Sequence, residues 1–204
     1  MKNTQRKIFS SLKKITPVLF VLIYTSCNSP YIPKPAGYFK ISFPQKKYRV
    51  FNQPGFPYSF EYPEYAAIVR DSSFFGDTPE NPWWINVEFP QFSGRMYISY
   101  KEIGKYKLDA LISDAYKLTG KQTVRANYID DSLLSISPDV HGVLFKVTGD
   151  VATAAQFFLT DSAQNFLRGS LYFDAPPNQD SLQPVNDFLL QDMRHLINTF
   201  QWKK

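Results

Sequence analysis

Segments in which apolar and polar side chains alternate recur along most of this chain of 204 residues. Side chains on a strand point alternately to its two faces, so a period of two is typical of strands with one buried face. Proline closes several of these segments, and proline cannot continue a central ladder. We expect strands at residues 38–43, 58–62, 85–89, 95–100, 133–136, 141–148, 155–160 and 166–173.

Two segments have the helical period instead. The first covers residues 107–118 and is expected to end at Gly120. The second is expected to be capped by Ser181, with Pro184 in its first turn. Its apolar stripe consists of Val185, Phe188, Leu189, Leu196, Ile197 and Phe200. This order of elements predicts an α+β fold, in which a largely antiparallel sheet is covered by two helices.

The first 26 residues have the three zones of an export signal. Their charged side chains are all basic, namely Lys2, Arg6, Lys7, Lys13 and Lys14. The apolar run at residues 15–24 follows, and it is too short for a bilayer, which needs about 20 residues in a helix. Residues 1–26 are therefore predicted to be a signal peptide.

Cys27 is the only cysteine, and it lies where the signal would be cleaved. A small residue before a cysteine that follows an apolar run resembles the lipobox of bacterial lipoproteins. Ser26 fits that pattern, whereas Tyr24 stands where leucine is usual. We expect Cys27 to carry acyl chains that anchor the protein to membrane lipids, and the competing interpretation is an ordinary free thiol. Stable anchoring takes more than one chain, and a fully modified lipoprotein cysteine has three.

Residues 27–36 are predicted to form a proline-rich tether, and residues 37–204 a single globular domain. An extended tether of this kind covers about 3.1 Å per residue, which keeps the domain near its membrane. Asn28 is not the aspartate that retains enteric lipoproteins in the inner membrane, and no acidic cluster follows Cys27. By analogy, we expect the outer membrane, with the domain facing the periplasm.

Charge and composition exclude several function classes. Removing the five basic residues of the signal leaves 18 positive and 18 negative charges, so the rest of the chain lacks the surplus that nucleic-acid binding needs. One cysteine and two histidines, His141 and His195, do not make a zinc site. We expect no metal and no cofactor.

Catalytic motifs are also missing from the sequence. Ala115 stands where a phosphate loop ending at Gly120-Lys121 would need glycine, and no Gly-x-Ser-x-Gly elbow occurs. A carboxylate pair that includes Glu61 stays open, because such pairs meet only in the fold. Asp161 and Arg168 bracket a tight turn, and stabilisation of that turn is the favoured interpretation. We expect no enzyme.

Trp83 and Trp84 are the candidate partner-binding residues. Adjacent residues of a strand point to opposite faces, so both indoles cannot be buried on one side. If Trp84 starts the buried alternation, Trp83 faces outward or lies under a loop. An exposed tryptophan often marks a binding surface, and a cap over an open sheet edge is an equally weighted interpretation.

Several segments together resemble the gliding-motility lipoprotein D family (GldD) of Bacteroidota. These are residues 33–39 behind the lipobox cysteine, 57–63, 156–162, 166–173 and the ending at 192–202. The resemblance covers nearly the whole mature chain. It implies an envelope lipoprotein required for gliding and linked to the type IX secretion machinery, and it assigns no catalytic residue. The order of elements also resembles, in pattern only, the PsbP/Mog1-type α/β/α sandwich.

The sequence therefore predicts a membrane-anchored, non-enzymatic assembly or stabilising component whose partners are other gliding and secretion proteins of the envelope. A periplasmic glycan- or lipid-binding module is the alternative, and it would use Trp83 and neighbouring aromatic side chains as a stacking platform. An envelope hydrolase would instead need polar side chains converging near Asp161, Arg168, Glu61 or His141.

Overall fold

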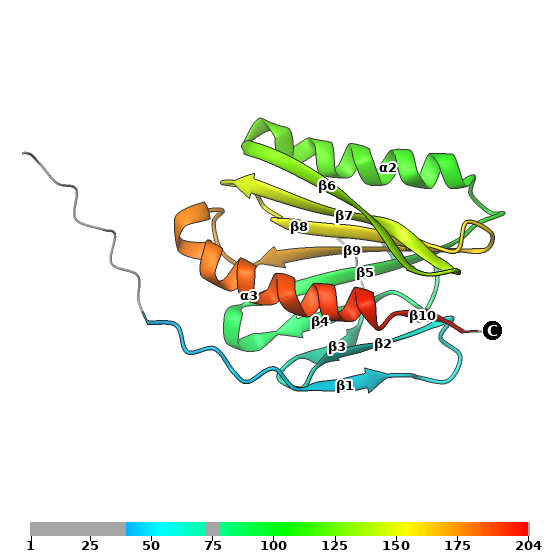
Figure 1. The fold of residues 1–204 in the computed structure, drawn as a ribbon, viewed down its shortest axis with the longest axis horizontal. Coiled ribbons are helices and arrows are strands. Elements are labelled where there is room, and N and C mark those ends of the chain that lie inside the picture. The colour runs from blue at the N-terminus through cyan, green and yellow to red at the C-terminus, as the bar shows by residue number, and fades with distance from the viewer. Residues whose placement is uncertain (1–39, 72–77, 204) are drawn as a thin grey trace, which may run out of the picture. The chain divides into compact units, whose positions relative to one another are not determined.

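The computed structural model describes residues 40–71 and 78–203, so Cys27, the predicted signal peptide and the predicted tether lie outside the described residues. The elements of the described part are shown in Figure 1. Its helices are α2 (Leu108–Gly120) and α3 (Gln179–Asn198), with the 3₁₀ turns η1 (Pro90–Phe92) and η2 (Lys121–Val124). Its strands are β1 (Tyr48–Phe51), β2 (Tyr58–Pro63), β3 (Ala67–Arg70), β4 (Ile85–Phe89), β5 (Gly94–Glu102), β6 (Ala126–Ser137), β7 (Val140–Gly149), β8 (Ala155–Thr160), β9 (Asn165–Phe173) and β10 (Gln201–Trp202).

The strands form two antiparallel sheets. The larger sheet has seven strands in the order β3-β4-β5-β9-β8-β7-β6, and the smaller has three in the order β1-β2-β10. Neighbouring strands in both sheets pair antiparallel. Most of the large sheet is joined by hairpins, which suits the alternating pattern of its sequence.

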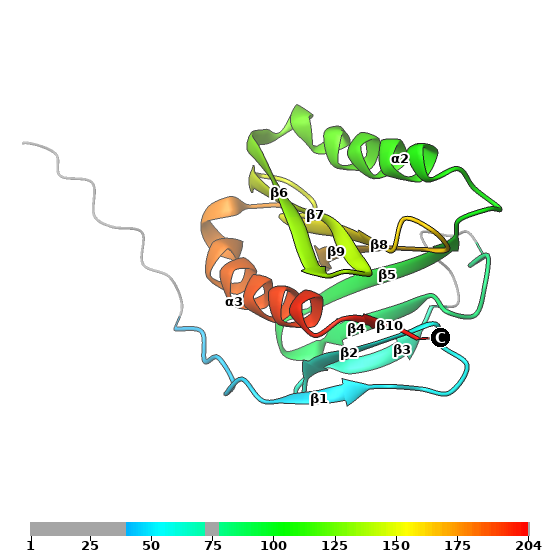
Figure 2. The same ribbon diagram turned by 45° about the vertical axis from the view of Figure 1, so that its right-hand side comes forward.

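The two helices cover opposite faces of the large sheet, as the two views show (Figures 1 and 2). Phe157 and Phe158 are neighbours on β8, so their rings point to opposite faces. Phe157 belongs to the apolar cluster that contains Leu189 of α3, and Phe158 belongs to the cluster that contains Leu111 of α2. The predicted α+β class, with a largely antiparallel sheet covered by two helices, is confirmed.

The small sheet joins the core on the α3 side. Its strands contribute Phe51, Tyr58 and Phe60 to the cluster that contains α3. The rings of Phe51 and Phe60 stack with centroids 5.0 Å apart, and Phe200, just after α3, lies 5.9 Å from Tyr58. The dense aromatic content of the sequence is thus largely used to pack α3 between two sheets.

The predicted strand at residues 38–43 is wrong for its described part, because residues 40–47 belong to no strand. Phe43 packs on α3 instead, where its ring stacks on that of Phe188 with centroids 4.5 Å apart. The first strand is β1, which pairs with β2 through Tyr48↔Pro63 to Phe51↔Phe60. The short strands β3 and β10 were not predicted, since four and two residues are too few to show a period.

Helix α2 ends at Gly120, as predicted, whereas α3 is capped by a different residue from the predicted Ser181. Gly120 keeps a helical φ of −59°, and the chain continues into η2, so it does not end the helix by a left-handed turn. The cap of α3 is Asn178, whose side chain accepts a hydrogen bond of 2.9 Å from the backbone N–H of Ser181. Pro184 consequently lies inside α3. Within the described ranges, neither helix is long and apolar enough to cross a membrane.

Candidate functional site

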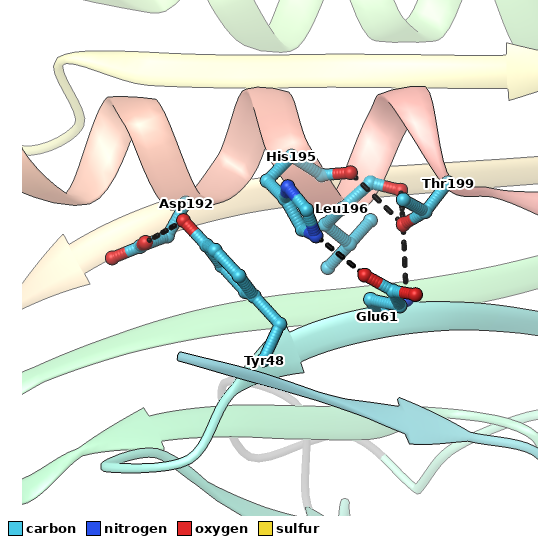
Figure 3. A network of polar contacts seen from close by, with 6 residues as sticks. All are labelled: Tyr48, Glu61, Asp192, His195, Leu196 and Thr199. Atoms are coloured by element: carbon cyan, nitrogen blue, oxygen red, sulfur yellow. Dashed lines mark hydrogen bonds and ion pairs between the residues drawn. The ribbon is translucent and has the colours of Figure 1, made fainter. Parts of the chain in front are cut away.

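A polar network joins α3 to the segment through which the chain enters the domain. We call it the α3 network, and its members are Lys46, Tyr48, Glu61, Tyr65, Asp192, His195 and Thr199; Figure 3 shows most of them. The network has two parts, one centred on Asp192 and the other on His195, which lies one turn further along the helix.

Asp192 is the buried acceptor of the first part. Only 1% of its surface is exposed, and aspartate is almost never buried to this extent unless it is paired. Its Oδ1 accepts hydrogen bonds from Lys46 Nζ at 2.7 Å and from the Tyr48 hydroxyl at 2.8 Å. Its Oδ2 accepts a hydrogen bond from the Tyr65 hydroxyl. Three donors therefore surround this carboxylate, two from the entry segment and one from the turn that follows β2, which is what a buried charge requires.

Lys46 makes two further contacts with the same helix. Its ammonium donates to the carbonyl oxygen of Phe188 at 2.8 Å and lies 3.7 Å from the centre of the Phe188 ring. The side chain is only 23% exposed. A cation–π contact is stronger where water is partly excluded. Lys46 therefore binds α3 through an ion pair, a hydrogen bond and a cation–π contact.

Tyr48 and Tyr65 act as neutral donors. Burial raises the pKa of Tyr48 above its ordinary value, and the hydrogen bond to Asp192 raises it further. Burial and the same carboxylate raise the pKa of Tyr65. Both phenols hence keep their protons at physiological pH and hold them toward Asp192.

The second part links His195 to strand β2. His195 Nε2 and Glu61 Oε2 are 2.7 Å apart, and the imidazole stacks on the Tyr48 ring with centroids 3.5 Å apart. Thr199 Oγ1 accepts a hydrogen bond of 3.0 Å from the Glu61 backbone N–H and donates to the carbonyl oxygen of His195 at 2.9 Å. The threonine hydroxyl therefore donates its proton to a carbonyl oxygen of the helix, and it is not positioned as a nucleophile that the imidazole could activate.

Asp192 and Lys46 were not predicted from the sequence as site residues. The apolar stripe of α3 contains Leu189 and Leu196, and Asp192 lies between them at helical spacing. A lone carboxylate inside such a stripe is a signal for a buried polar contact. His195 is half-buried against Tyr48 and Glu61.

The two candidate partner-binding tryptophans are placed differently. Trp84 is 8% exposed, and its Nε1 donates to the carbonyl oxygen of Tyr100 at 2.8 Å, so it is a core residue. Trp83 is half-buried, donates from Nε1 to the carbonyl oxygen of Gly55 at 2.7 Å and packs edge-on against Tyr100 at 5.3 Å. Because Trp84 is enclosed, a partner that binds here would contact Trp83.

A small pocket of about 70 Å³ lies beside Trp83, lined by charged and aromatic side chains. Glu80 accepts a hydrogen bond of 2.5 Å from the Tyr106 hydroxyl and pairs with Lys101 Nζ at 3.2 Å. Lys105 Nζ lies 3.8 Å from the same carboxylate. The bond from Tyr106, together with the two lysines, holds the pKa of Glu80 below its ordinary value.

Glu61 joins the α3 network, but Asp161, Arg168 and His141, the other positions at which a hydrolase site was considered, do not converge with it or with one another. Asp161 Oδ1 accepts from the backbone N–H groups of residues 163, 164 and 165, which is the expected turn stabilisation. Arg168 donates to Gln156 rather than to Asp161. His141 contacts the carbonyl oxygen of Pro138 in its own hairpin at 2.8 Å. Residues 40–71 and 78–203 contain no group of three metal-ligating side chains.

The fold and the α3 network define a layered α+β domain whose entry segment is fixed to its last helix. The chain belongs to the gliding motility lipoprotein GldD family, whose model matches residues 28–202. The predicted family is thereby confirmed over residues 28–202. No curated protein matches the chain in sequence.

One solved structure with a similar arrangement is the solution structure of cyanobacterial PsbP (CyanoP) from Synechocystis sp. PCC 6803. It is 12% identical in sequence, with a TM-score of 0.44, over 83% of this chain and 100% of that chain.

Proposed function

We propose that this gliding motility lipoprotein is a non-enzymatic assembly or stabilising component of the gliding apparatus, linked to type IX secretion. In this proposal, acylated Cys27 anchors it in the outer membrane, and its domain faces the periplasm. The observation that carries the proposal is the family match, which begins one residue after Cys27 and runs to the last strand.

The α3 network suits a protein that is held by one end. The chain leaves the predicted anchor through the segment that contains Lys46 and Tyr48, and both side chains bond to Asp192. A pull on the anchor is therefore resisted by side chains packed on α3, and not only by the four residue pairs between β1 and β2. In this account, the polar groups of the network serve attachment and not catalysis.

The anchor also sets the concentration of the domain near its partners. Nine residues of extended tether reach roughly 28 Å. Confinement at that distance raises the effective concentration for other membrane-bound proteins, so weak contacts suffice. Trp83 is the proposed contact residue, since it combines a large apolar ring with partial exposure.

The anchoring proposal is tested in a gliding bacterium that lacks its own family member. One strain carries the full chain, and the other carries residues 28–204 exported behind an ordinary cleavable signal, so that failed processing is not mistaken for loss of the anchor. We expect gliding only with the full chain, at equal protein abundance by immunoblot. Full gliding with the unanchored domain would show that the anchor is not part of its mechanism.

The contact residue is tested by capture from native membranes. Trp83→Ala is compared with Tyr128→Ala, which removes an exposed aromatic ring from the distant strand β6. We expect Trp83→Ala alone to lose envelope proteins that the parent chain retains, with both variants folded by circular dichroism. Unchanged capture by Trp83→Ala would refute this residue as the contact.

A further inference from the structure

Three buried side chains with unpartnered polar atoms lie in line across the large sheet. The register pairs Asn86 with Tyr97, Tyr97 with Ser170, and Ser170 with Gln156, so the row crosses β4, β5, β9 and β8. Asn86, Ser170 and Gln156 are 6%, 1% and 1% exposed. Asn86 Oδ1, Ser170 Oγ and Gln156 Nε2 have no hydrogen-bond partner among the described residues. Such groups are rare in folded proteins, since leaving them unpaired costs stability.

The half-buried guanidinium of Arg168 lies beside this row. Arg168 is two residues before Ser170 on β9, so both side chains point to the same face. Its Nη2 donates to Gln156 Oε1. No carboxylate in residues 40–71 or 78–203 lies within ion-pair distance of it, whereas Arg95 on the same face pairs with Glu88 at 3.1 Å. Burial lowers the pKa of Arg168, but a guanidinium stays charged at neutral pH all the same.

The free donors of these residues are adjacent. Because Gln156 Oε1 is occupied by Arg168, the amide Nε2 of the same side chain points to another position. Ser170 is directly opposite Gln156, and side chains in that relation have Cβ atoms about 4.5–5.5 Å apart. The hydroxyl and the amide are not bonded to each other. A single acceptor that contacts both groups would satisfy both donors and would lie close to the guanidinium, since Gln156 also bonds to Arg168.

The surroundings select the kind of acceptor. A single unpaired guanidinium suits a monoanion, and a planar carboxylate matches its fork of N–H groups. Phe158 is directly opposite Arg168 on β8, and the rings of Tyr97 and Tyr172 form an edge-to-face pair at 5.7 Å on the other side. We propose that Arg168, Gln156 and Ser170 bind the carboxylate of an organic acid on the sheet face that α2 partly covers. This site is separate from Trp83 and does not depend on the proposed function.

The test is a titration followed by the side-chain N–H signals of Arg168 and Gln156 in nuclear magnetic resonance. The probes are sodium benzoate, a tripeptide with a free carboxyl terminus, and the uncharged partners of each, benzamide and the tripeptide amide. We expect saturable shifts with a carboxylate and none with its amide. Saturation by benzoate supports a small acid as the source, and saturation by the tripeptide acid alone supports a peptide terminus.

Two variants distinguish binding at this site from a general effect of positive charge on the same sheet face. Arg168→Met is expected to weaken carboxylate binding at least about tenfold, the loss typical of one charge-assisted hydrogen bond. Arg95→Met, which removes a cation that already has a carboxylate partner, should leave the affinity within about twofold. The wild-type titration stands even if Arg168→Met does not fold. If neither carboxylate shifts the two signals, or if the amides bind equally well, the proposal is wrong.

Discussion

Replacing Asp192 by alanine tests whether the α3 network fastens the entry segment to the domain. The substitution removes the acceptor of Lys46, Tyr48 and Tyr65 at once. Breaking a buried ion pair by removing one partner costs about 3–5 kcal/mol, because the other charge is left unpaired. Lys46 is 23% exposed and keeps its bond to the Phe188 carbonyl oxygen. We therefore expect the lower end, about 3 kcal/mol, for the free energy of unfolding.

The assay is urea unfolding of the domain, followed by the fluorescence of its tryptophans. An unchanged slope with a lower midpoint identifies a loss of stability in the folded state. Lys46→Met should cost less in the Asp192→Ala background than alone, because the cation no longer has a partner to lose. The difference is expected to be about 1–2 kcal/mol, the range of directly contacting charged pairs.

The control is Asp187→Ala, which removes an exposed carboxylate from the same helix. It should change stability by no more than about 0.5 kcal/mol. If Asp192→Ala falls in that same narrow range, the carboxylate does not hold the entry segment, and the mechanical interpretation of the network is refuted.

Three further predictions concern packing, pH and the surface pair. Gly169→Ala should cost about 1–3 kcal/mol in urea unfolding, because a Cβ there would lie 2.2 Å from the buried ring of Phe157; no loss would mean that the ring moves freely. Burial raises the pKa of Tyr100 to about 12, with nearby acidic groups adding to it. Its contribution to stability is thus complete below pH about 10 and is lost as the pH rises to about 12. Stability measured over that range should fall less steeply in Tyr100→Phe, and equal slopes would contradict the raised pKa. Glu61→Gln should change the free energy of unfolding by less than about 1 kcal/mol, since both members of the Glu61–His195 pair are partly exposed. A larger loss would show that this pair contributes substantially to holding α3 on β2.

The periodic parts of the sequence predicted the fold well. The segment at 58–62 is a strand whose alternate side chains are buried in the core, which is what alternation encodes. The segments at 85–89 and 155–160 are also strands, and their side chains are buried on both faces of the sheet. Helix α2 was found within two residues at its end. The described part of the predicted strand 38–43 was misjudged because Phe43 packs on α3, and local sequence does not distinguish that contact from strand pairing.

The polar contacts were harder to predict from the sequence. Lys46 and Asp192 are 146 residues apart, and only the fold brings them together. Asp161 and Arg168 bracket the same turn in the sequence, yet the side chains on a strand follow its faces, and this places Arg168 over Gln156 of the neighbouring strand. Contacts within a hairpin turn, such as those of Asp161, were predicted because they are local.

The central claim, that this family member acts as a lipid-anchored protein, is tested most directly by the mass of the mature amino terminus. The protein is purified from the membranes of its native host, and its amino-terminal peptide is measured by mass spectrometry. We predict that the mature chain begins at Cys27 and carries a thioether-linked diacylglycerol with an acylated amino group. A mature chain in which Cys27 is unmodified would contradict the claim.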